Sequence, residues 1–100
     1  MKSGIYRYRF SRRVRWPIVD RTLASAVAAV QALYGEARSR LEIGYAQDPN
    51  RKTLIVDATS PAGRAFARIV AGLLINRFGA DAVRIEPVVR RRRKTAVSRW

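Results

Sequence analysis

The sequence contains no cysteine and no histidine among its 100 residues. The lack of cysteine excludes disulfides, thiolate catalysis and zinc–cysteine sites, and the lack of histidine removes the commonest general base and metal ligand. No apolar run approaches the roughly 20 residues that a membrane span requires, and the N-terminus has no apolar signal core. We therefore expect a protein without enzymatic activity, cofactor or metal, in the cytoplasm.

Acidic residues are also scarce, with seven against 21 lysines and arginines, for a formal charge of +14. A hundred residues with 48% hydrophobic content can build one modest core. We expect a single domain over residues 1–89. Residues 90–100 begin with five consecutive cations and are expected to form a basic, flexible tail.

The clearest local signal is a strand followed at once by a helix. Residues 53–57 are short, apolar and β-branched, which is typical of a buried strand. Ser60 is a candidate N-cap, Pro61 suits the first helical position, and Gly79 suits the helix end. Apolar residues recur between them at three- and four-residue spacing. The sequence therefore predicts a helix over 61–78.

Three further strands and one helix are predicted around this unit. Alternating residues predict strands at 5–10, 40–47 and 82–88, and an alanine-rich stretch with apolar residues every three or four positions predicts a helix near 20–34. Asp48-Pro49-Asn50 is a strong turn signal, so the second and third strands should form a hairpin.

The predicted order is β-α-β-β-α-β, the ferredoxin-like arrangement of an α+β domain. In this two-layer sandwich, two helices cover one face of a four-stranded antiparallel sheet with strand order 4-1-3-2. The expected core residues are Tyr8, Val27, Val30, Leu54, Val56, Phe66, Ile69, Val70, Leu73 and Ile85.

The first strand alternates aromatic and basic residues. Tyr6, Tyr8 and Phe10 share one face, and Arg7 and Arg9 share the other. Because an unpaired arginine is costly to bury, the aromatic face should meet the helices. In the alternative orientation the tyrosines would be free to stack on bases, as aromatics do in RNA-recognition motifs, but strand 53–57 lacks the matching aromatics.

Arginine dominates the basic residues, with 18 of the 21, and its planar guanidinium suits phosphate recognition. We expect a non-enzymatic nucleic-acid-binding module, RNA in preference to DNA on fold analogy, that contacts the phosphate backbone. The predicted site comprises Arg7, Arg9, Arg12, Arg13, Arg15, Arg84, Arg90, Arg91, Arg92, Arg93 and Lys94. No membrane or small-molecule partner is expected.

Several alternatives stay open at this point. The chain could be a protein-interaction or structural assembly subunit that self-associates or binds an acidic protein, and Trp16 and Trp100 are candidate exposed anchors. The helix start at 58–64 could hold a phosphate, although plain capping explains the same residues. Glu42, Asp57 and Glu86 could share the open sheet face, where pairing with arginine is favoured over a metal site.

Overall fold

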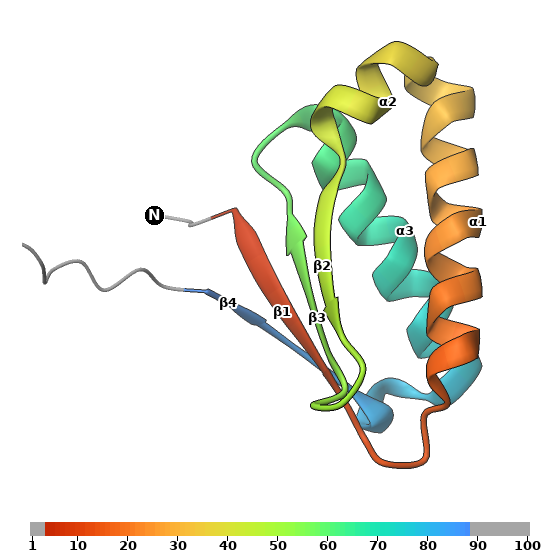
Figure 1. Cartoon of the computed structure of the whole chain (residues 1–100), viewed down its shortest axis with the longest axis vertical. Coiled ribbons are helices and arrows are strands. Elements are labelled where there is room, and N and C mark those ends of the chain that lie inside the picture. The colour runs from red at the N-terminus through yellow and green to blue at the C-terminus, as the bar shows by residue number, and fades with distance from the viewer. Residues whose placement is uncertain (1–3, 89–100) are drawn as a thin grey trace, which may run out of the picture.

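The computed structural model describes residues 4–88, which form an α+β domain with one four-stranded antiparallel sheet and three α-helices (Figure 1). The predicted tail, 90–100, and Trp100 lie outside the described residues. In chain order the elements are β1 (Ile5–Phe10), α1 (Trp16–Tyr34), α2 (Glu36–Glu42), β2 (Gly44–Asp48), β3 (Thr53–Asp57), α3 (Pro61–Phe78), the short 3₁₀ helix η1 (Ala80–Ala82) and β4 (Val83–Pro87).

The sheet has the strand order β2-β3-β1-β4, with all neighbours antiparallel. Read from its other edge, this is the order 4-1-3-2. β1 and β3 are central, whereas β2 and β4 are edge strands. Helices α1 and α3 lie on the same side of the sheet, and no helix within residues 4–88 covers the opposite face (Figure 1).

The region between α1 and β3 differs from the prediction. The predicted strand 40–47 is instead the end of α2 followed by β2, and Leu41 lies in α2 with an exposed fraction of 86%. Gly35 has a φ of 88°, which breaks the helical path and permits α2 to start at the next residue. Two ion pairs across one turn, Arg38–Glu42 and Arg40–Glu36, stabilise the short helix.

Helix α1 begins at Trp16, with Pro17 in its first turn. The Trp16 ring packs edge-to-face on Phe10 with a centroid distance of 5.4 Å, and its indole N–H donates to the Gln47 side chain at 2.8 Å. Trp16 therefore joins the start of α1 to β1 and β2. These contacts favour the packing role of Trp16 over that of an exposed anchor.

The core lies between the sheet and helices α1 and α3. Of the ten predicted core residues, Tyr8, Val30, Leu54, Val56, Phe66 and Val70 are buried, and Val27 and Ile69 pack partly buried against them. The prediction is wrong for Leu73 and Ile85, which are 42% and 38% exposed. Helix α3 buries Leu74 in place of Leu73, and Ile85 lies on an edge strand that the helices cover only in part.

Candidate nucleic-acid interface

The open face of the sheet carries the arginines that the sequence placed there. Tyr8 is 2% exposed and Phe10 is also buried, so the aromatic face of β1 meets the helices as predicted. Arg7 and Arg9 therefore lie on the opposite face. The register places Arg7 beside Glu86 and Arg9 beside Arg84, which brings Arg84 onto the same face. The inverted orientation of β1, with tyrosines free to stack on bases, is wrong.

Glu86 holds two of these three arginines. Its carboxylate lies 3.4 Å from Arg7 Nη1 and 3.0 Å from Arg9 Nε. The side chains of Arg7, Arg9 and Glu86 are all partly exposed, so each ion pair is weak. Each guanidinium also keeps further N–H donors directed to solvent. Arg84 is exposed and has no ion pair with any residue between 4 and 88. The pairing of Glu86 with arginine follows the prediction.

A shallow hollow of about 590 Å³ lies on this face over β1, β3 and β2. Arg7, Arg9 and Arg51 line it together with the neutral side chains of Ile55 and Thr53 and the carboxylate of Asp48. The mixture of charges makes the hollow only mildly basic. It is therefore not the part of the surface with the largest excess of positive charge.

The connection between β1 and α1, residues 11–15, carries the arginines most available to a ligand. Arg12 and Arg15 are exposed and make no ion pair or side-chain hydrogen bond within the described chain. Arg13 is partly occupied, because its guanidinium donates to the Phe78 carbonyl at 3.1 Å and lies 3.3 Å from Asp81. The structure thus divides these three predicted residues into two free cations and one that ties the loop to the end of α3.

Lys52 holds the same connection from the other side, a role that sequence analysis missed. Its ammonium donates to the carbonyls of Arg12 and Val14, and its backbone adopts a φ of 52° in the β2–β3 turn. The amide of Ser11 donates to Ala82 at 3.0 Å. These contacts fix the backbone of the loop while the side chains of Arg12 and Arg15 remain free.

These segments gather at one end of the molecule. Figure 1 shows the β1–α1 connection, the β2–β3 turn and η1 together at the lower end. Residues 11–15, 48–52 and 80–84 carry six cations, Arg12, Arg13, Arg15, Arg51, Lys52 and Arg84, against two acids, Asp48 and Asp81. We call these six cations the basic end. At the opposite end, the arginines of α2 are paired with its glutamates.

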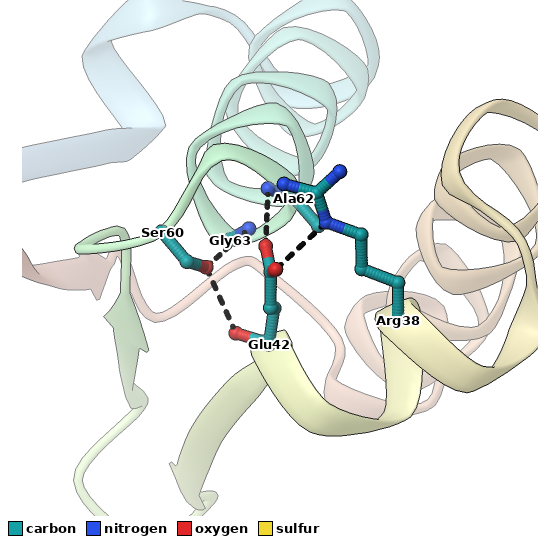
Figure 2. A network of polar contacts seen from close by, with 5 residues as sticks. All are labelled: Arg38, Glu42, Ser60, Ala62 and Gly63. Carbon is teal, nitrogen blue, oxygen red and sulfur yellow. Dashed lines mark hydrogen bonds and ion pairs between the residues drawn. The ribbon is translucent and has the colours of Figure 1, made fainter.

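The start of α3 is occupied by the protein's own groups. Ser60 Oγ accepts from the Gly63 amide at 3.0 Å, and the Glu42 carboxylate accepts from the Ala62 amide at 2.9 Å and from Arg38 Nε at 2.8 Å (Figure 2). The hydrogen bond from Arg38, followed by that from the Ala62 amide, lowers the pKa of Glu42. Capping, and not a vacant phosphate site, therefore accounts for this segment.

Gly63 is required by close packing at the same place. A Cβ on it would lie 2.6 Å from the Asp57 carbonyl oxygen and 2.8 Å from Ser60 Oγ. Asp57 itself accepts from the Thr59 amide and hydroxyl, so it forms part of the turn into α3.

Glu42, Asp57 and Glu86 do not converge, because Glu42 binds the start of α3, Asp57 binds Thr59, and Glu86 pairs with arginines. No group of three potential metal ligands occurs within residues 4–88.

The tail residues Arg90, Arg91, Arg92, Arg93 and Lys94 lie outside the described residues. Within residues 4–88, no helix is both long enough and apolar enough to cross a membrane. No family model matches the chain, and comparisons with curated proteins and with solved structures also gave no match.

Proposed function

We propose that this protein is a small non-enzymatic module that binds the phosphate backbone of nucleic acid, RNA in preference to DNA. The observation that carries the proposal is the basic end, where Arg12 and Arg15 are exposed, have no acidic partner within residues 4–88, and project from a loop whose backbone is anchored by Lys52. Because the loop backbone is already held in place, phosphate binding has to order only the arginine side chains, and the release of counterions from the nucleic acid supplies affinity.

The candidate arginines have different roles in this proposal. Arg12, Arg15 and Arg84 are free within the described chain and would make the first phosphate contacts. Arg7 and Arg9 would contribute less, because Glu86 already neutralises part of their charge. Arg13 positions the loop through Asp81. The cations at 90–94 are proposed from the sequence alone as a second, separate contact.

We infer that the domain is a ferredoxin-like βαββαβ sandwich in which α2 is an addition. The strand order and the placement of α1 and α3 on one face support this assignment. Many domains of this architecture bind RNA, and this analogy favours RNA over DNA. Because no aromatic of the described strands is placed on the open face, we expect weak sequence selectivity and dissociation constants of roughly 10⁻⁴–10⁻⁶ M at physiological salt. The cytoplasmic location stays a prediction.

The test is a salt titration of binding to single-stranded RNA, duplex RNA and duplex DNA of equal length. Two double variants remove the same charge from different places: Arg12→Gln with Arg15→Gln at the basic end, and Arg64→Gln with Arg68→Gln on α3. Loss of two phosphate contacts should reduce the slope of log K against log salt by about 1.4–1.8 in the first variant only. Removal of residues 90–100 should lower affinity further.

Two results would contradict the proposal. In the first, none of the three nucleic acids binds more tightly than about 100 μM at low salt, which would assign the positive charge to another role. In the second, the α3 variant loses as much affinity as the basic-end variant. Equal loss would mean that net charge, and not the arrangement of Arg12 and Arg15, determines binding.

A second candidate, a self-associating assembly subunit, is favoured by two exposed leucines. Leu33 at the end of α1 and Leu41 in α2 are 72% and 86% exposed, and their helices meet at the upper end of the molecule (Figure 1). If this corner mediates self-association, sedimentation at high salt should show a dimer that Leu33→Glu with Leu41→Glu converts to a monomer. A monomeric native chain at high protein concentration would remove this candidate.

A further inference from the structure

The sheet extends beyond its helical cover at β4. In one cross-strand row, Leu54 and Tyr8 are buried whereas the next residue, Ile85, is 38% exposed. A groove of about 220 Å³ lies beside it, between β4 and α3. Tyr6, Tyr8 and Ile85 supply apolar surface in this groove. The groove is therefore an apolar strip on the helical side of the sheet, distinct from the open face and from the basic end.

Two arginines of α3, Arg64 and Arg68, line this groove. Both are exposed, and neither makes an ion pair or a side-chain hydrogen bond with any residue of the 4–88 segment. They are four residues apart, so they project from the same side of α3 at successive turns. Two unpaired cations next to an apolar strip indicate a partner that is acidic and also has apolar surface to bury.

The backbone of β4 adds a third feature. Val88 N donates to Ile5 O and Ser11 N donates to Ala82 O, so the even-numbered residues along β4 direct their backbone groups toward β1. The alternation of an antiparallel ladder then directs the backbone of Ile85 and Pro87 outward. Since β4 is the last strand of the sheet, this edge offers the amide and carbonyl of Ile85 and the carbonyl of Pro87. Such an edge can accept another strand.

The advance of two residues along a strand is close to the spacing of the two arginines along α3. Four residues of α3 rise about 6 Å, and two residues of a strand advance about 6.6 Å. We propose that an extended acidic segment of a partner protein adds to β4 as a fifth strand, with two acidic side chains, separated by one residue, placed in the groove against Arg64 and Arg68. The aliphatic parts of these side chains would cover Ile85.

Charge distinguishes this occupant from the other candidates. The chain's own residues 90–94 are five cations, so they would meet Arg64 and Arg68 with like charge. A second copy paired through β4 would bring the same two arginines together. Nucleic acid could neutralise the arginines but cannot continue the backbone hydrogen bonding of a sheet edge. A strand of acidic peptide can pair with the two arginines, cover the apolar strip and form backbone hydrogen bonds with β4.

The test uses the full chain, isotopically labelled, and a blocked peptide of threonine and valine that contains two glutamates separated by one residue. A control peptide has the same composition with the glutamates adjacent, which places them on opposite faces of a strand. Binding of the first peptide should slow hydrogen exchange at the Ile85 amide and should be tighter than binding of the control. Arg64→Gln with Arg68→Gln should weaken it about two- to thirtyfold, from two partly exposed ion pairs.

The matched variant, Arg12→Gln with Arg15→Gln, should bind the peptide like the native chain, and both variants should unfold at the same temperature as the native chain because these side chains have no partners within residues 4–88. The proposal is overturned if Ile85 shows no slowing, or if the two variants weaken peptide binding equally. It is also overturned if the Ile85 amide is already protected without peptide, because the edge would then be occupied by the chain itself.

Discussion

Leu73 and Leu74 are adjacent on α3 but differ in environment, so they provide a matched test of how α3 packs. Leu74 is fully buried, whereas Leu73 lines the groove between α1 and α3 and is 42% exposed. Consecutive residues of a helix are rotated by about 100°, so only one of the two can face the sheet. The sequence analysis named Leu73 among the core residues, and the structure buries Leu74 instead.

The expected magnitudes follow from burial. Leu74→Ala removes three buried carbon atoms, worth about 2.4 kcal/mol of transfer free energy, and the cavity it leaves raises the expected cost into the range of about 2–5 kcal/mol. At Leu73 about half of the transfer term applies and water can fill the space, so we expect roughly 1 kcal/mol. Alanine's slightly higher helix propensity offsets a few tenths in both variants.

The assay is urea unfolding followed by circular dichroism, with the free energies of unfolding compared at constant salt. The slope of the free energy against urea concentration should be the same in all three proteins, which shows that the variants change stability alone. Leu74→Ala should lower the free energy of unfolding at least twice as much as Leu73→Ala. An equal cost, or a larger cost for Leu73→Ala, would show that α3 presents a different face to the sheet. Arg64 and Arg68 would then not line the groove between α3 and β4, and the proposed peptide site would fail too.

The unit from β3 to α3 could be predicted because every signal in it is local. Ser60 caps the helix through its own side chain, Pro61 occupies the first turn, and Gly79 ends the helix with a φ of 92°. A β-branched apolar run before such a start has few alternatives. The aromatic and basic faces of β1 were equally predictable, because burial of Arg7 and Arg9 would have cost far more than their exposure.

Residues 36–48 could not be assigned in the same way. Leu41, Ile43 and Tyr45 alternate as in one half-buried strand, yet Leu41 lies in the last turn of a short helix, Ile43 caps that helix, and only Tyr45 lies in β2. What decides the outcome is not local. Glu42 reaches the start of α3, 20 residues later in the sequence, and accepts from the Ala62 amide. That contact becomes visible only when the two helices are placed together.

The candidate site shows the same limit. Sequence alone placed Arg7 and Arg9 on one face and favoured the pairing of Glu86 with arginine, but it could not show which arginines Glu86 contacts, since that depends on the register of β1 and β4. In the sequence, Arg64 drew notice only as part of the helix start at 58–64, and Arg68 was not singled out. Their significance depends on the groove beside β4, which exists because the helices leave this edge strand partly uncovered.

Two further predictions concern ionisable groups. Burial raises the pKa of Tyr8 from 10.0 to about 12, so the unfolded chain ionises first and the native chain should lose stability between pH 10 and 12. Tyr8→Phe should remove that loss, although it also removes the 2.7 Å hydrogen bond from the Tyr8 hydroxyl to the Ala67 carbonyl. The pKa shift of Glu42 has the opposite direction. Its pKa is lowered from 4.5 by the Arg38 and Ala62 hydrogen bonds, so its contribution is present above pH 4.5 and is lost as the pH falls through the lower, folded-state value. Glu42→Gln should therefore be less stable than the native chain at pH 7, and the difference should shrink toward pH 3. The measurement is the urea midpoint of both proteins at intervals between pH 3 and pH 7. Parallel curves for the two proteins would mean that the carboxylate does not hold α2 against the start of α3.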